Sequence, residues 1–162
     1  MSDERHFRVA VIGAGPAGIG TAVSLAKRGI GPVVLIERRA EAGGTPMGYR
    51  RKDGGVPTFV EWTRGRVVFG EELAERMLER LARTDAQLRL STQVIRIHPA
   101  EKRLTLLGPE GVFDIAADAV VLAAGAREQT PAEKGWLAGA RTARVGFTRH
   151  LTGWLDRHGL LP

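Results

Sequence analysis

Apolar positions in the first forty residues fall into two short runs with a glycine-rich segment between them. The run at residues 9–12 is short and rich in β-branched side chains, so it predicts a buried strand. A second run, at residues 32–37, predicts a strand that ends in an acid. Residues 16–28 are the expected helix, because proline suits its first position and Gly29 follows its last turn. The pattern predicts a strand–helix–strand unit.

A second helix and several short strands follow this unit. Residues 70–83 place leucines and a methionine at helical spacing, which predicts an amphipathic crossover helix. From residue 87 to residue 115 the period changes to two and predicts three short antiparallel strands. Residues 116–122 lead into an apolar strand that we expect to be buried inside a parallel sheet. The expected fold class is α/β, a parallel sheet with a three-stranded antiparallel insertion.

The glycines between the first two strands have the spacing GxGxxG. Gly13 allows a tight strand-to-helix turn, Gly15 lets a pyrophosphate approach the backbone, and Gly18 lets the helix pack close to the strand. Glu37 lies 19 residues after Gly18, where a Rossmann-like unit places the carboxylate that accepts from a ribose. A glycine-rich turn without a nucleotide is the alternative, but the ordered strand, turn, helix, strand and acid favour dinucleotide binding.

Three further stretches allow two interpretations each. The Gly43-Gly44 pair permits a close approach to a flat ligand, or it belongs to an ordinary loop. The small residues at 123–125 follow a strand, so they permit either cofactor approach or close helix packing. Residues 50–52 are basic and form either a solvated charge run or a phosphate contact, within a stretch, 45–66, expected to be irregular.

Composition narrows the class of protein. The 162 residues are 43% hydrophobic and 26% charged, which is enough to build one core, and no cysteine is present. A disulfide framework, a thiolate metal site and a redox cysteine pair are therefore excluded, and no histidine has a metal-ligand context. We expect residues 1–130 to form the nucleotide-binding domain. Residues 131–162, with a helix near 148–158, form a tail that caps its core or contacts a partner.

Charge and hydropathy bear on partners and location. The net charge of +6 is scattered along the chain, which disfavours nucleic acid as the partner and suits a polyanionic cofactor or an acidic partner chain. The apolar stretch at residues 9–26 is interrupted by the glycine motif, so we expect neither a signal peptide nor a membrane span. The expected location is the cytoplasm.

These residues together resemble a known family. GAGPAG at 13–18, the acid Glu37, the Gly43-Gly44 loop and VVLAAGAR at 120–127 are similar to the FAD-binding half of the two-dinucleotide-domain flavoproteins, the FAD/NAD(P)-dependent pyridine nucleotide oxidoreductases. GGTP at 43–46 and GARE at 125–128 resemble dye-linked amine, opine or proline dehydrogenase subunits. Ala124 stands where the family's short motif usually has threonine.

The resemblance implies FAD as the cofactor and assigns its contacts. Glu37 would bind the ribose beside Arg38, Val94 would contact adenine through its backbone, and the remaining segments would hold the pyrophosphate and the flavin side. The implied contacts are Gly13, Ala14, Gly15, Pro16, Ala17 and Gly18; Glu37 and Arg38; Gly43, Gly44 and Thr45; Val94; and Ala123, Ala124 and Gly125. No side chain resembles a family catalytic base, and in such enzymes the flavin does the chemistry.

Two family features are missing from the sequence. It has no second GxGxxG for NAD(P), and no returning Gly-Asp segment to complete the flavin site. We therefore expect another subunit or self-association to complete that site. The leading hypothesis is an FAD-binding oxidoreductase module that transfers hydride from a small amine- or amino-acid-like substrate to flavin and on to an acceptor. The alternative is a non-catalytic nucleotide-binding or assembly module.

Overall fold

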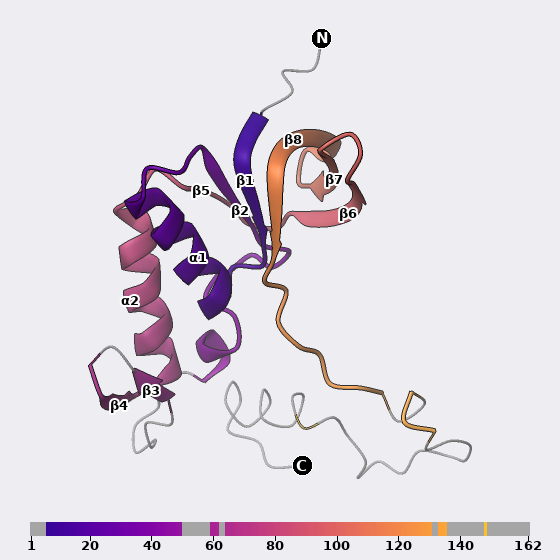
Figure 1. Ribbon diagram of the computed structural model, residues 1–162. Helices are drawn as coiled ribbons and strands as arrows, with labels where there is room; N and C mark the ends of the chain where they lie inside the picture. The colour runs from indigo at the N-terminus through magenta and orange to yellow at the C-terminus, as the bar shows by residue number, and fades with distance from the viewer. Residues whose placement is uncertain (1–5, 50–58, 62–63, 131–132, 136–147, 149–162) are drawn as a thin grey trace.

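The predicted strand–helix–strand unit is present at the start of the chain. β1 (His6–Ile12), α1 (Pro16–Lys27) and β2 (Val33–Ile36) follow in order, and β1 pairs with β2 in parallel from Val9↔Val33 to Ile12↔Ile36. The computed structural model describes residues 6–49, 59–61, 64–130, 133–135 and 148. Figure 1 shows the course of the chain.

Local signals set both ends of α1. Pro16 occupies its first turn, where the missing N–H costs nothing. At the other end Gly29 has φ +68°, a left-handed conformation that glycine adopts without a Cβ penalty. The amides of Gly29 and Ile30 then donate to the carbonyl oxygens of Ala26 and Leu25, each over 3.0 Å. This is a Schellman cap, so the predicted helix end at Gly29 is confirmed.

The main sheet has six strands in the order β5-β2-β1-β8-β7-β6. Its later members are β5 (Gln87–Arg89), β6 (Gln93–His98), β7 (Arg103–Gly108) and β8 (Gly111–Leu122). β5, β2, β1 and the end of β8 are parallel, whereas β6, β7 and the start of β8 are antiparallel. The predicted α/β fold class, a Rossmann-like parallel sheet with a three-stranded antiparallel insertion, is confirmed.

Two strand boundaries differ from the sequence prediction. Residues 87–89 do not open the antiparallel insertion, because β5 pairs in parallel with β2 through Leu35↔Leu88. Residues 112–122 are not two strands, because β8 runs unbroken over 12 residues. No glycine or proline lies within residues 112–122, so nothing in this stretch of sequence ends the strand early.

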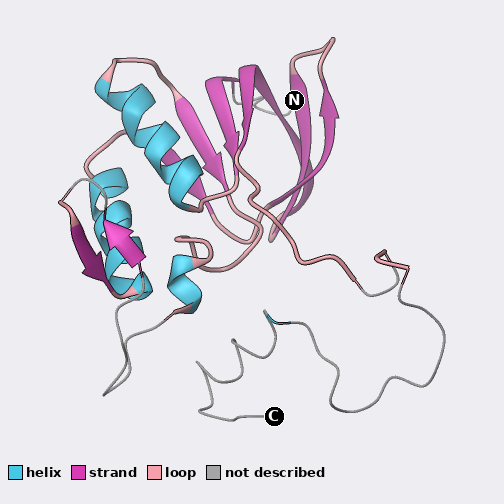
Figure 2. Ribbon diagram, turned by 60° about the horizontal axis from the view of Figure 1, so that its bottom comes forward, coloured by secondary structure: helices cyan, strands magenta, loops and turns pink. Residues whose placement is uncertain are grey.

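Helices and the antiparallel strands cover opposite faces of the parallel strands. α1 and α2 (Gly70–Ala82) lie together on one side, and β6–β8 curl over the other (Figures 1 and 2). The helix side buries Val9, Val11, Ile19, Ala22, Val23, Val33, Leu35 and Leu81. The other side buries Phe7, Ala10, Val34, Ile36, Leu104, Leu106, Ile115 and Ala117.

The end of β8 is less buried than its apolar sequence predicts. β8 lies between β1 and β7, as expected for a strand inside the sheet. Val121 packs against the cluster beneath the helices. Val120 is 37% exposed and Leu122 is 70% exposed, so the expectation of a fully buried strand is wrong there. Their side chains share the face of Ala10 and Ile12, the partners in the parallel register.

The stretch expected to be irregular contains regular structure. A 3₁₀ turn (η1, Pro46–Gly48) precedes a short antiparallel hairpin of β3 (Phe59–Glu61) and β4 (Arg66–Val68). Glu61 is 4% exposed and accepts hydrogen bonds from Arg66 Nε (3.1 Å) and from Arg76 Nη1 on α2 (2.8 Å). A buried carboxylate bonded to arginines of both the hairpin and the helix thus fixes one to the other.

Some expectations fall outside the described residues. The basic run at 50–52 lies outside them, as does nearly all of the tail, including all but the first residue of the helix expected at 148–158. The division of the chain at residue 130 therefore stays a prediction. In the part of the chain that the structure describes, no helix is long and apolar enough to cross a membrane.

Candidate functional site

The candidate site lies where β1, β2 and β8 end side by side. The amide of Gly13, just after β1, donates to Ile36 O at the end of β2 over 2.8 Å. The amide of Ala123, just after β8, donates to Ile12 O over 2.8 Å. The glycine turn therefore sits between two neighbouring strand ends, the position at which open α/β sheets bind ligands.

Two of the three motif glycines are required by the protein's own packing. A Cβ at Gly13 would lie 2.4 Å from Ala123 O, and φ there is +104°. A Cβ at Gly18 would lie 1.8 Å from Gly13 O and 3.3 Å from Leu35 Cδ1. The predicted roles, a tight turn at Gly13 and close helix–strand packing at Gly18, are what this geometry requires.

Gly15 is different, because none of the described residues comes close enough to require a glycine there. A Cβ at Gly15 would meet only Gly44 Cα, at 3.8 Å, which is ordinary contact. Its φ of −85° is also open to any residue. Gly15 caps α1 without a side-chain hydrogen bond, and the following amides of Ala17 and Gly18 belong to the first turn, which has no intrahelical acceptors. This helix end suits a phosphate.

The Gly43-Gly44 pair packs against the glycine turn itself. Gly43 N donates to Ala14 O over 2.8 Å, and both glycines have positive φ, +110° and +67°. A Cβ at Gly44 would lie 2.7 Å from Gly15 Cα. Two backbones thus meet at van der Waals distance beside the site. The pair is therefore held tightly against the glycine turn, and its contact with a flat ligand stays a prediction.

Glu37 is a buried carboxylate with one bond to each oxygen. It is 9% exposed; Ala14 N donates to Oε2 over 2.9 Å and Arg39 N donates to Oε1 over 3.0 Å. A carboxylate oxygen has two lone-pair directions, so each oxygen keeps an acceptor position for a ligand hydroxyl. Glu37 also lines both cavities of the site, so these positions are within reach of a ligand.

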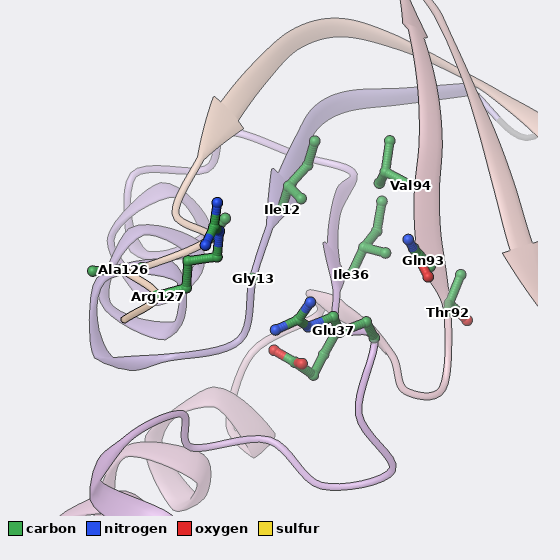
Figure 3. A pocket seen from close by; sticks show the side chains of 12 residues that line it. Ile12, Gly13, Ile36, Glu37, Thr92, Gln93, Val94, Ala126 and Arg127 are labelled. Carbon is green, nitrogen blue, oxygen red and sulfur yellow. The ribbon is translucent and has the colours of Figure 1, made fainter. Parts of the chain in front are cut away.

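Two adjoining cavities share the Gly13–Glu37 region. The first, about 350 Å³, lies on the side of β6 and is drawn in Figure 3; its lining residues are Ile12, Gly13, Ile36, Glu37, Arg38, Thr92, Gln93, Val94, Ala124, Gly125, Ala126 and Arg127. The second, about 360 Å³, lies over the start of α1. Its lining residues are Gly13, Gly15, Pro16, Ala17, Glu37, Arg38, Arg39, Gly44, Thr45, Leu122, Ala123, Ala124, Gly125 and Ala126. The first we call the β6 cavity and the second the α1 cavity.

Most residues that the sequence singled out line these cavities. Three of them do not: Ala14, Gly18 and Gly43 lie behind the residues that line the cavities. Sequence reasoning missed a further set: Ile12, Ile36, Arg39, Thr92, Gln93, Leu122, Ala126 and Arg127. Three of these residues are the last in the strands that meet here: Ile12 in β1, Ile36 in β2 and Leu122 in β8. Their place at the strand ends was the signal that could have identified them. The others are neighbours of predicted residues.

Positive charge surrounds the cavities. Arg38 lines both cavities, Arg39 the α1 cavity and Arg127 the β6 cavity. Arg127 pairs with Glu133 through both guanidinium Nη atoms, with Nη1 at 2.8 Å from Oε2. The hydrogen bond from Arg127, then the one from the Thr130 backbone, lowers the pKa of Glu133 to about 2, and the same pair raises the pKa of Arg127.

Comparison with known proteins agrees with this geometry. Residues 7–152 match the family described as pyridine nucleotide-disulphide oxidoreductase. The chain belongs to this family. The resemblance noted from the motifs is thereby confirmed, and the family's cofactor chemistry implies FAD binding. The sequence has no cysteine, so the disulphide chemistry of the family's name has no residues in this chain.

Each relative matches most of this chain, but the matched part is a minor part of the relative. An opine oxidase subunit of Rhizobium meliloti is 33% identical over 154 residues, which are 94% of this chain and 31% of that protein. Ferredoxin–NADP reductase of Streptococcus thermophilus is 30% identical over 134 residues, 77% of this chain and 36% of that protein. The chain thus spans about a third of the length of these curated relatives.

A solved structure shares the fold at similar coverage. L-proline dehydrogenase from P. horikoshii superposes with a TM-score of 0.63 at 28% identity and covers 78% of this chain and 24% of that chain. These relatives are oxidoreductases, as is the family. Among the described residues no group of three histidine or acidic side chains is placed to hold a metal ion.

Proposed function

We propose that this chain binds FAD in the two adjoining cavities and is the flavin-binding part of an oxidoreductase. The observation that carries this proposal is the contrast between Gly15 and the other motif glycines. The protein's own packing excludes a side chain at Gly13 and Gly18, but it leaves room for one at Gly15. A ligand that must approach the backbone closely would explain why residue 15 is a glycine.

The lining residues fit the parts of an adenine dinucleotide. The α1 cavity has the helix end and Arg39 for a pyrophosphate. Glu37, between the cavities, has an open acceptor position on each oxygen for ribose hydroxyls. The β6 cavity, with Val94, suits the adenine ring. Gly44, Thr45 and the segment at 123–125 would face the flavin side. The sequence carries one GxGxxG, so the proposal gives the chain one dinucleotide site.

The proposed reaction uses a small amine- or amino-acid-like substrate. When bound, FAD supplies the redox chemistry: it accepts hydride from that substrate and passes the electrons to an acceptor. The similarity to L-proline dehydrogenase and to an opine oxidase subunit supports this substrate class. The chain's own residues bind and orient the cofactor, and the described residues that line the two cavities include no histidine, lysine, tyrosine or cysteine.

We further propose that a second chain, or a second copy of this one, completes the flavin site. The similarity to a protein named as a subunit supports this assembly. We keep the cytoplasm as the proposed location, which cell fractionation would test. Size-exclusion chromatography with and without FAD tests the assembly: a purely monomeric, fully FAD-loaded chain would contradict it.

FAD binding is tested with Gly15→Ala and the matched control Gly20→Ala. Both add one methyl group in or next to α1, and a Cβ at Gly20 meets nothing within 4 Å. We expect both variants to fold, Gly20→Ala to bind FAD like the wild type, and Gly15→Ala to lose most of its affinity. Equal affinity in both variants, measured by flavin fluorescence, would overturn the proposal, as would a wild-type chain that binds no FAD.

A second candidate is a non-catalytic nucleotide-binding or assembly module. The lining of the two cavities favours it, because those residues supply binding groups and no proton-transferring side chain beyond Glu37. It predicts FAD binding without reduction by any donor. Screening amines and amino acids for reduction of an acceptor dye, with the FAD-loaded chain and its copurified partner, separates the two: dye reduction selects the oxidoreductase.

A further inference from the structure

Arg127 contributes a fixed guanidinium group to the wall of the β6 cavity. Both of its Nη atoms bond the Glu133 carboxylate. Glu133 is held in turn, because Thr130 N donates to its Oε2 over 2.8 Å and Thr130 Oγ1 donates over 3.1 Å. The Glu133 amide donates back to Thr130 Oγ1 over 3.2 Å, so Thr130 and Glu133 bond each other reciprocally, as the two end residues of a capping box do. The arginine is thus held before any ligand arrives.

This arrangement engages the edge of the guanidinium plane and leaves its faces open. A two-point bond to a carboxylate uses the N–H groups that lie in the plane, whereas stacking uses the flat faces. The Arg127 side chain is 67% exposed, so its faces are accessible. Figure 3 shows Arg127 on one side of the β6 cavity and Val94 on the other, with Ile12 and Ile36 between them.

The other walls of this cavity suit a flat ring with polar edges. Ile12, Ile36 and Val94 are aliphatic, and Thr92 and Gln93 supply polar groups at one end. Arg127 does not line the α1 cavity, where the helix end and Arg39 would meet the pyrophosphate. Its position therefore favours contact with a base rather than with a phosphate.

We propose that Arg127, held by Glu133, stacks on the adenine ring of the bound dinucleotide and makes the site select purine over pyrimidine nucleotides. The inference rests on the proposed function, since it assumes a nucleotide in the two cavities. Guanidinium planes stack on bases, and an exposed cation over an aromatic ring contributes a modest amount to affinity. Glu133 is a positioning residue, because it reaches the ring only through Arg127.

The test measures ADP and UDP affinities by competition with FAD. ADP and UDP share ribose and phosphates and differ in the base. We expect Arg127→Ala to weaken ADP roughly threefold to tenfold and UDP by less than about twofold. Arg127→Lys should lose as much ADP affinity as Arg127→Ala, because an ammonium has no flat face. Glu133→Gln should lose less. Arg103→Ala is the control and should change neither affinity. Arg103, on β7, pairs with Glu101 and Asp114 and lines neither cavity.

Each other outcome counts against a defined part of the proposal. Unchanged ADP affinity in Arg127→Ala, with loss in Gly15→Ala, overturns the stacking and leaves FAD binding intact. Equal fold-losses for ADP and UDP, or wild-type ADP affinity in Arg127→Lys, show that Arg127 acts through charge and overturn it as well. A wild-type chain that binds neither FAD nor ADP overturns both proposals. Thermal unfolding of each variant confirms that the compared proteins are folded.

Discussion

The amide of Ala14 donates to Oε2 of Glu37 over 2.9 Å and so joins the glycine turn to the end of the second strand. The residues are 23 positions apart in the chain, and the bond is buried. Glu37, which we expect to bind a ribose, is thus also hydrogen-bonded to the turn that would hold the pyrophosphate. Changes at Glu37 should alter the fold and the ligand site together.

Glu37→Gln should destabilise the protein even without a ligand. The amide side chain keeps one oxygen, so either the Ala14 or the Arg39 amide faces an N–H group and loses its acceptor. A buried donor left without a partner costs about 1–3 kcal/mol. Urea unfolding of the unliganded chain measures this cost. Glu75→Gln, at an exposed position on α2, is the control, and equal stabilities for the two variants would contradict the prediction.

Gly18→Ala and Gly20→Ala should have opposite effects on stability, although both add a methyl group to α1. The Cβ at Gly18 would lie 1.8 Å from Gly13 O, so the helix must move away from the turn. At Gly20 the methyl meets no atom, and alanine is favoured over glycine in a helix by about 1 kcal/mol. Thermal melting should show a lower Tm for Gly18→Ala and a higher one for Gly20→Ala. A Gly18→Ala variant as stable as the wild type would refute the packing argument.

Adjacent leucines on β7 should differ sharply in their contribution. Leu106 is fully buried in the core beneath the antiparallel strands, whereas Leu107 is 44% exposed. Leu106→Ala should cost about 2–5 kcal/mol through lost burial and the cavity left behind. Leu107→Ala, the matched control, should cost less than about 1 kcal/mol. Chemical denaturation of both variants gives the two values, and similar costs would mean that the strand faces are assigned wrongly.

The Arg127–Glu133 pair should persist in mild acid. The pKa of Glu133 lies near 2, below its ordinary value of 4.5. A carboxylate with a lowered pKa stabilises the folded form fully above its unfolded pKa and loses that contribution as the pH falls toward 2. NMR titration of the Glu133 carboxyl carbon should therefore show a midpoint near 2.

Variants identify the cause of this shift. Arg127→Ala removes the largest contribution and should raise the midpoint clearly. Thr130→Ala keeps the backbone donor and should raise it less. The pair is exposed to solvent, so added salt should weaken it. An unchanged midpoint in Arg127→Ala would show that the pair does not form in solution.

The strand–helix–strand unit was predictable from sequence because its signals are local. Gly13, Gly15 and Gly18 fall within six residues, and a Cβ at Gly18 would meet Gly13 O, only five positions earlier. Pro16 and Gly29 likewise set the ends of α1 through their own backbone conformations. The residues that the motif singled out therefore gather at one sheet edge.

The missed features depend on contacts between distant segments. The β3–β4 hairpin has strands of three residues, too short for a periodic pattern, and Glu61 fixes it to Arg76, 15 positions later. Arg127 enters the β6 cavity because β8 happens to end beside β1. Thr92, just before β6, and Gln93, the first residue of β6, line the same cavity. No short window of sequence carries that information.

Because β8 is unbroken, we expect the parallel strands and the antiparallel strands to unfold together. Its first half bonds β7 from Gly111 to Ala116, and its second half bonds β1 from Ala116 to Leu122. Separating the antiparallel layer from the parallel strands would require this one strand to bend away from a neighbour. Amide hydrogens along β8 are therefore expected to exchange with solvent only when the whole sheet opens, so both layers form a single cooperative unit.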